Sequence, residues 1–197
     1  MVKIGDKAPD FKAQAFIKGE FKDITLSEYK GKWVVLFFYP GDFTFVCPTE
    51  LTSIAIRYKE IQKLDAEIFA LSVDSVFVHK MWQQNELSKM IERGVPYPML
   101  SDPGGKIGRM FGVYDEDLGI DLRGRFIIDP DGVLQSMEVV SLSVGRSVEE
   151  LLRQIEAFSH VRKKEGSELC PANWAPGKEI IMNDTDFAGE VCRIWKP

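Results

Sequence analysis

The 197-residue sequence is poor in the residues that metal sites and disulfide frameworks require, with three cysteines and two histidines. Three cysteines cannot all pair within one chain, and none of them lies in a Cys-x-x-Cys motif. A secreted disulfide framework and a structural zinc site are therefore both disfavoured, and we predict no bound metal. Cys47, Cys170 and Cys192 are then either inert or redox-active.

Long hydrophobic runs and a strong charge of one sign are also missing. The longest apolar run, Trp33–Pro40, is far shorter than the roughly 18 residues of a membrane-spanning helix. The first residues lack the apolar core of a signal peptide. The net charge is −5 and the longest basic run is Arg162–Lys164, so nucleic acid is an unfavourable partner. We expect a cytosolic protein that binds neither membranes nor nucleic acid.

The first half of the chain has the pattern of an α/β fold. Two short alternating segments, 11–16 and 21–26, predict a hairpin. The continuous apolar run Trp33–Tyr39 predicts a strand that is buried on both faces. Apolar residues spaced by three and four over 49–64 predict a helix, and Glu67–Val73 predicts a second buried strand. A strand, a helix and a strand joined by short links form a βαβ unit with parallel strands.

The second half adds an antiparallel hairpin and a final helix. Its predicted elements are a helix over 76–91, a short strand over 97–100, a short helix over 105–111, a hairpin formed by 125–129 and 133–140, and a helix over 147–162. This order is that of a thioredoxin-like core, and periodicity is lost after about residue 165. We predict a thioredoxin-like α/β domain over residues 1–164, opened by the N-terminal hairpin, and a C-terminal extension over 165–197.

Cys47 lies between the end of a buried strand and the start of a helix, and Pro48 suits the first helical turn. The unpaired backbone N–H groups of a helix start stabilise a thiolate, which is the nucleophilic form of cysteine. Thr44 supplies a hydroxyl that can bond the thiolate or an incoming oxygen, while Pro40 and Phe43 can shield the thiol from water. On placement alone, an ordinary buried cysteine remains the alternative.

The segment Tyr39–Glu50, which reads Tyr-Pro-Gly-Asp-Phe-Thr-Phe-Val-Cys-Pro-Thr-Glu, resembles the active-site motif of peroxiredoxins. It is most similar to the typical two-cysteine, alkyl hydroperoxide reductase branch. The likeness covers almost the whole chain, through Ala8–Phe11, Ser72–Ser75, Arg123–Gly124, Phe126–Asp129, Val144–Arg146 and Cys170–Trp174. It implies a thioredoxin fold and an antioxidant thiol peroxidase that reduces hydrogen peroxide and organic hydroperoxides.

The resemblance assigns Cys47 as the peroxidatic cysteine, Thr44 and Pro40 as its pocket partners, and Arg123 as the pocket arginine. Arg125 alternates with Arg123 on one strand, so spacing alone does not choose between them. Thiolate attack on a peroxide builds negative charge on the leaving oxygen, which a guanidinium and a hydroxyl stabilise. The product is a sulfenic acid.

Glu50 and Arg146 match positions that support this pocket through a hydrogen-bonded charge network, and a weakly coupled surface ion pair is the alternative. Cys170 matches the resolving cysteine, which implies an intersubunit disulfide and an antiparallel homodimer. Rings of dimers, such as decamers, are common in the family. The resemblance implies no cofactor, and reduction by a separate dithiol protein of the thioredoxin-like or flavoprotein reductase kind.

The sequence also departs from the family pattern. Cys192 has no counterpart in the core pattern, and a spare resolving thiol, a relay toward the reductant and an inert tail residue are its three interpretations, of which we favour the last. No tyrosine follows Tyr114, so the Tyr-Phe pair of easily overoxidised members is absent, and no Gly-Gly-Leu-Gly insertion precedes Tyr97. We therefore expect easy local unfolding around Cys47 and resistance to excess peroxide.

Other functions stay open. A redox-regulated chaperone or peroxide-signalling protein is the main alternative. A thioredoxin-type disulfide exchanger is disfavoured because no second cysteine follows Cys47 by three residues. A thiol protease is disfavoured because neither histidine is placed in the sequence to act as its base.

Overall fold

The computed structural model describes residues 2–196. The chain forms two compact units, which meet in the sequence between Val148 and Glu149. Within the described residues, no helix is both long and apolar enough to cross a membrane.

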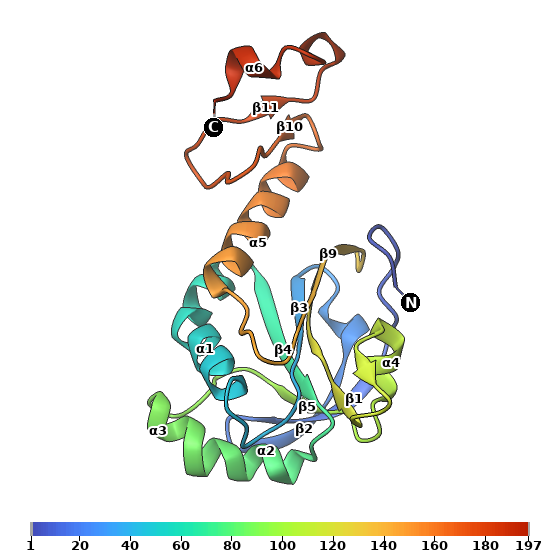
Figure 1. Ribbon diagram of the computed structural model, residues 1–197, viewed down its shortest axis with the longest axis vertical. Coiled ribbons are helices and arrows are strands. Elements are labelled where there is room, and N and C mark those ends of the chain that lie inside the picture. Colours follow the sequence, from blue (N-terminus) through green and yellow to red (C-terminus); the bar gives the residue numbers. More distant parts are fainter. Residues whose placement is uncertain (1, 197) are drawn as a thin grey trace. The chain divides into compact units, whose positions relative to one another are not determined.

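The larger unit is built on a seven-stranded sheet with the order β2-β1-β5-β4-β3-β8-β9 (Figure 1). The central strand β4 is parallel to β3 and β5, and the other pairs in this sheet are antiparallel. The predicted leading hairpin and the later hairpin are both confirmed. The strands are β1 (Lys12–Ile17), β2 (Glu20–Thr25), β3 (Trp33–Phe38), β4 (Ala66–Ser72), β5 (Met99–Ser101), β8 (Arg123–Ile128) and β9 (Leu134–Val140).

Helix α1 (Cys47–Lys63) connects β3 to β4 and completes the predicted parallel βαβ unit. The predicted helix over 76–91 is instead interrupted after α2 (Val76–Trp82) by a π turn at Gln83–Leu87 and continues as α3 (Ser88–Met90). The Gln83 side chain bonds the backbone of Arg93 and Val95. Helical spacing gives no sign of this tertiary contact. A short 3₁₀ turn, η1 (Leu26–Tyr29), and helix α4 (Lys106–Phe111) complete the helical segments of this unit.

All six residues of β3 are buried, as the continuous apolar run predicts. Val34, Leu36 and Phe38 share one face of the strand and belong to a core cluster that includes Ile107 and Phe111 of α4. In Figure 1, α1 and α4 lie on opposite sides of β3 and β4. Since both faces of the strand are covered, its C-terminal end is held rigidly where the loop toward α1 begins.

The smaller unit comprises most of α5 (Val148–Lys163) and the segment that follows it. Its further elements are β10 (Glu168–Leu169), β11 (Ile181–Met182), a 3₁₀ turn η3 (Thr185–Phe187) and α6 (Val191–Ile194), and β10 pairs with β11. Elements this short carry no periodicity, which is also why the small hairpin of β6 (Tyr114–Asp115) and β7 (Ile120–Asp121) was not expected. The predicted domain limits, 1–164 and 165–197, stay a prediction.

Candidate active site

Cys47 is the first residue of α1, and its side chain is completely buried. The helix begins directly after the loop that leaves β3, and Pro48 occupies its first turn. The backbone N–H groups of Thr49 and Glu50 turn back to the carbonyl of Val46. The thiol therefore stands at a helix N-terminus, as the sequence predicts, with the partial positive charge of that terminus beside it.

Arg123 brings a full positive charge to the sulfur. Its Nη1 lies 3.3 Å from Cys47 Sγ and 2.7 Å from Glu50 Oε2, and its Nε donates to the carbonyl of Leu142 at 2.8 Å. The antiparallel pairing of β8 with β3 places the start of β8 beside the end of β3. Arg125, two residues further along β8, bonds Ser147 O and Glu138 instead. The structure thus separates two arginines that spacing could not.

Arg146 completes a buried charge network around Glu50. Glu50 Oε1 accepts hydrogen bonds from the backbone N of Arg146 at 2.9 Å and from its Nε at 2.8 Å. Arg146 also donates to Gly124 O at 2.6 Å, and its guanidinium stacks on the ring of Phe37. Both Glu50 and Arg146 are buried, so the alternative of a surface ion pair is wrong.

Burial lowers the pKa of Arg146, and its bonds to Glu50 oppose that shift. Arg123 links this network to the cysteine, because the same Nη1 contacts both Glu50 and the Cys47 sulfur. A guanidinium in this position can stabilise negative charge that develops at the sulfur or on an oxygen bound beside it.

Thr44 and Pro40 lie in the loop that joins β3 to α1, and both are half-buried. The Thr44 hydroxyl donates to Gly41 O at 2.9 Å. This bond uses its hydrogen within the loop and leaves oxygen lone pairs to accept another bond. Phe43 was expected to help shield the thiol, but its side chain is 53% exposed and contacts Trp82. Its backbone lies in the left-handed region, with φ +54°.

A buried hydrogen-bond network that the sequence analysis missed anchors this loop. The Tyr39 hydroxyl donates to Asp42 Oδ1 at 2.8 Å, and His79 Nδ1 lies 2.8 Å from Asp42 Oδ2. His79 Nε2 lies 3.2 Å from the carbonyl of Leu100, which can only accept, so this nitrogen carries a hydrogen. Burial raises the pKa of Asp42, and the His79 bond opposes it.

His79 belongs to α2. Its spacing of three from Val76 and from Trp82 places it on the buried side of α2, and all three side chains are buried. A histidine on an apolar face needs partners for both ring nitrogens. This requirement is the sequence feature that could have indicated a hydrogen-bond partner for His79. The sequence does not identify that partner, because Asp42 lies 37 residues away from His79.

The other two cysteines lie in the smaller unit. Cys170 is half-buried, and its Sγ donates to the carbonyl of Ala157 at 3.7 Å. Burial raises the pKa of its thiol, Glu168 adds to that effect, and Arg153 opposes both. Cys192 is exposed on α6, and all three cysteines are free thiols.

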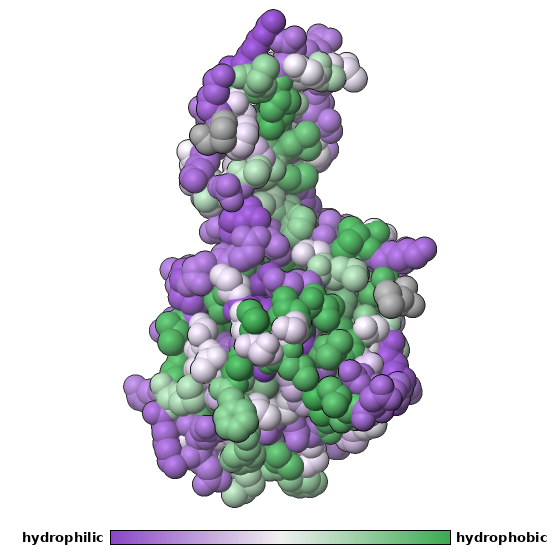
Figure 2. All heavy atoms as spheres, in the orientation of Figure 1, coloured by the Kyte–Doolittle hydropathy of each residue, from purple (hydrophilic) through white to green (hydrophobic). Residues whose placement is uncertain are grey.

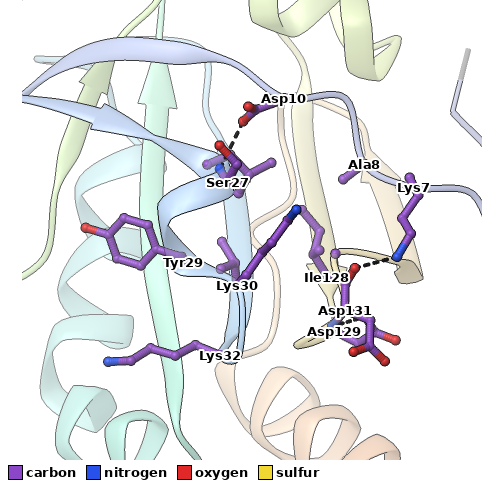
Figure 3. Close-up of a pocket in the computed structure, with 13 residues that line it drawn as sticks. Lys7, Ala8, Asp10, Ser27, Tyr29, Lys30, Lys32, Ile128, Asp129 and Asp131 are labelled. Carbon is purple, nitrogen blue, oxygen red and sulfur yellow. Dashed lines mark hydrogen bonds between the residues drawn. The ribbon is translucent and has the colours of Figure 1, made fainter.

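A cavity of about 340 Å³ lies elsewhere in the larger unit and contains none of the predicted site residues (Figure 3). Lys32 and Val34 of its lining stand at the opposite end of β3 from Cys47. Lys7 on its rim donates to the carbonyl of Asp131 at 2.6 Å. Over residues 2–196, no three His, Cys, Asp or Glu side chains gather in a way that could hold a metal ion.

Comparison with known proteins agrees with this geometry. The AhpC/TSA family model matches residues 4–137, and the model for the C-terminal domain of 1-Cys peroxiredoxin matches residues 157–196. The chain is 57% identical over 195 residues to the selenocysteine-containing peroxiredoxin PrxU of Peptoclostridium acidaminophilum, covering 99% of this chain and 96% of the relative. It is 41% identical over 192 residues to alkyl hydroperoxide reductase C of Amphibacillus xylanus, covering 97% and 100%.

Solved structures show the same fold. The reduced 2-Cys peroxiredoxin of Plasmodium vivax superposes with a TM-score of 0.89 at 34% identity, covering 98% of this chain and all of the other. The AhpC of Enterococcus faecalis gives 0.80 at 41% identity, covering 87% and 100%. The thioredoxin-like α/β fold and the family resemblance predicted from the sequence are both confirmed. The chain therefore belongs to the peroxiredoxin family, the AhpC/TSA group of thiol peroxidases.

Proposed function

We propose that this protein reduces hydrogen peroxide and organic hydroperoxides through a sulfenic acid at Cys47 that Cys170 resolves. The observation that carries the proposal is the 3.3 Å contact between Arg123 Nη1 and the Cys47 sulfur at the start of α1. A buried thiol beside a guanidinium and a helix N-terminus combines nucleophile and charge stabilisation in one place.

In the first step, the Cys47 sulfur attacks the nearer peroxide oxygen. An S–O bond forms and the O–O bond breaks, so the sulfur is oxidised to the sulfenic acid while the leaving oxygen is reduced and departs as an alcohol or water after taking up a proton. Arg123 donates to the oxygen on which charge develops. The Thr44 oxygen accepts a hydrogen bond from the peroxide O–H, since its own hydrogen is directed to Gly41.

In the second step, the Cys170 thiolate attacks the sulfenic sulfur of Cys47. The S–S bond forms, the S–O bond breaks, and the hydroxide leaves as water with the proton that Cys170 released. A separate dithiol protein, of the thioredoxin-like or flavoprotein reductase kind, then reduces the disulfide by exchange. Cys192 takes no part in this scheme. The cytosolic location stays a prediction.

Peroxiredoxins are homo-oligomers whose substrate is peroxide. We propose that this protein forms an antiparallel homodimer, in which Cys47 of each subunit forms a disulfide with Cys170 of the other. Strand β9 supports this, because it is an edge strand of the sheet, and Met137 and Val139 on one of its faces are 41% and 43% exposed. Figure 2 shows hydrophobic side chains, in green, gathered on the part of the larger unit that contains β9. An open edge with apolar side chains favours pairing with a second chain.

A second apolar surface supports a ring of dimers. Phe21 and Phe77 contact each other with ring centroids 5.4 Å apart, although they are 45% and 67% exposed. Lys80 lies over the Phe21 ring. Large aromatic side chains that stay this exposed in one subunit are typical of interfaces.

The proposal is tested by following peroxide consumption with a generic dithiol in the wild type and in Cys47→Ser, Cys170→Ser and Cys192→Ser, with non-reducing gels of each. Turnover should be lost in Cys47→Ser, the linked dimer should be lost in Cys170→Ser, and Cys192→Ser, the matched control, should behave as wild type. Peroxide consumption by Cys47→Ser would overturn the assignment of the nucleophile. Loss of the disulfide in Cys192→Ser alone would move the resolving role to α6.

A further inference from the structure

One stripe of helix α5 holds the segment that contains Cys170. Five side chains recur along the helix at intervals of three and four residues, which places them on one face: Glu150, Arg153, Ala157, His160 and Lys164. Arg153, Ala157, His160 and Lys164 each contact the Glu168–Trp174 segment. This face of the helix is therefore a seat for Cys170.

The seat fastens the segment on both sides of the cysteine. Before it, Glu168 accepts from His160 Nε2 at 2.7 Å and from Lys164 Nζ at 2.9 Å. After it, the ring of Trp174 lies 5.1 Å from the His160 ring and is almost fully buried. The Cys170 thiol between them donates to a helix carbonyl. Both flanks must detach before Cys170 can move far.

Arg153 holds the part of the segment that follows Cys170 by a hydrogen bond to the backbone of Trp174. Its guanidinium donates twice to Glu150, with Nε and Nη2 2.6 Å and 2.7 Å from the two carboxylate oxygens. The remaining nitrogen, Nη1, donates to the carbonyl of Trp174 at 3.2 Å. Only a planar, forked cation can hold a carboxylate in two-point contact and bond a third acceptor. Glu150 thus orients Arg153 toward Trp174.

The seated thiol is poorly suited to react. Burial raises the pKa of Cys170, and resolution requires its thiolate. Its sulfur is also held against the carbonyl of Ala157, so Cys170 reacts more readily once it leaves the seat. We propose that Arg153 is a positioning residue that latches the Cys170–Trp174 turn onto α5 and so limits how fast Cys170 becomes available to the sulfenic acid. This inference rests on the resolving role proposed for Cys170.

Arg153 acts on the thiol in two opposite ways, and the structure indicates which one dominates. Its charge lowers the pKa of Cys170, but the burial that it helps to maintain raises that pKa and is the larger cause. Removing the latch should therefore free the thiol and lower its pKa. A purely electrostatic role would raise the pKa instead, so the pH dependence of Cys170 reactivity separates the two roles.

The test measures alkylation of Cys170 by iodoacetamide, between pH 6 and 10, in reduced protein that carries Cys47→Ser and Cys192→Ser. In this background Arg153→Met should raise the labelling rate near pH 7 by roughly three- to tenfold, as loss of one hydrogen bond of ordinary net strength predicts. The midpoint of the pH profile should fall. Arg153→Lys should also speed labelling, because lysine keeps the charge but lacks the fork.

Arg57→Met is the matched control, because Arg57 makes the same two-point contact with Glu60, three residues on, in α1, and is similarly exposed. Its labelling rate should equal that of the background protein. If circular dichroism shows that Arg153→Met does not fold, Glu150→Gln serves instead, since it weakens the two-point contact that orients Arg153 and keeps Arg153 itself. An unchanged rate in the folded Arg153 or Glu150 variant, or a midpoint that rises, overturns the latch.

The labelling experiment contains no peroxide, so it reads the latch even if Cys47 is not the peroxidatic residue. A rapid-quench experiment then tests whether the latch limits the resolution step of the proposed peroxidase reaction. It compares the rates of disulfide and sulfenic acid formation in wild-type protein and in protein that carries only Arg153→Met. Arg153→Met should form the disulfide faster, while sulfenic acid formation at Cys47 keeps its wild-type rate. If even the wild-type protein forms no disulfide, the proposed function fails, whatever the labelling result.

Discussion

Asp121 should make the stability of the protein fall as pH rises through the neutral range. This residue ends β7, its side chain is fully buried, and neither carboxylate oxygen has a hydrogen-bond partner among the described residues. Burial, followed by repulsion from Asp102, raises the pKa of Asp121 to about 7, while Arg109 opposes the shift. Asp102 itself accepts hydrogen bonds from the start of α4.

The size of the effect follows from that pKa. The ordinary value is 3.8, so the folded state holds a proton on Asp121 over about 3 pH units in which the unfolded state has lost it. At about 1.4 kcal/mol per unit, the contribution of Asp121 to the free energy of unfolding falls by about 4 kcal/mol between pH 4 and pH 7. Above pH 7 Asp121 is ionised in both the folded and the unfolded state, so the free-energy cost of burying its carboxylate no longer changes with pH.

Urea denaturation of the reduced protein at pH 5 and pH 8 tests this for wild type and Asp121→Asn. The asparagine resembles the protonated acid and does not titrate. Its unpaired amide costs about 1–3 kcal/mol at both pH values, so the informative quantity is the change in the mutational effect with pH. The variant should gain about 2–4 kcal/mol relative to wild type on going from pH 5 to pH 8.

The exposed Asp117, on the same small hairpin, provides the control. Asp117→Asn should change the free energy of unfolding equally at both pH values. The reasoning is refuted if Asp121→Asn shows the same difference from wild type at pH 5 and pH 8. It is also refuted if the asparagine variant loses stability relative to wild type as pH rises.

Three further predictions concern the site and the same buried acid. Arg123→Met should slow Cys47 oxidation by about 100-fold or more in stopped-flow measurements, because it removes the donor that we propose for the leaving oxygen. Glu50→Gln should lower the free energy of unfolding by about 3–5 kcal/mol in urea, because it leaves two buried guanidinium groups without their carboxylate. Gly108→Ala should destabilise the protein by about 1–3 kcal/mol, since a Cβ there would lie 2.0 Å from Asp121 Oδ1, and Asp121→Ala should rescue it.

The fold could be predicted from the sequence where a local pattern of apolar residues is enough to indicate a single strand or helix. The apolar run of β3 and the helical spacing of α1 each needed no distant contact, and together they placed Cys47 at a helix start. The π turn after α2 was not predictable, because it accompanies the bonds of Gln83 to residues ten and twelve positions away. The hairpin of β6 and β7 has two-residue strands, which no periodicity can reveal.

The candidate site also contains residues that the local sequence predicts and residues that it does not. Local sequence predicts a cysteine at a helix start, but the choice of Arg123 over Arg125 came from family resemblance, since strand alternation puts both on one face. The structure supplies the reason that spacing lacked: Arg125 is held by Ser147 and Glu138. The anchor formed by Asp42 and His79 required knowing that two segments far apart in the chain meet.

The seats of the two thiols suggest the order in which they act. Cys47 is buried against Arg123, which also contacts Glu50, and Glu50 in turn binds Arg146. Cys170 is held where burial raises its pKa and a helix carbonyl accepts its hydrogen. In the proposed mechanism, Cys47 therefore attacks the peroxide from its buried position beside Arg123. The proposed latch at Arg153 would delay the entry of Cys170 until the Cys170–Trp174 turn detaches from α5.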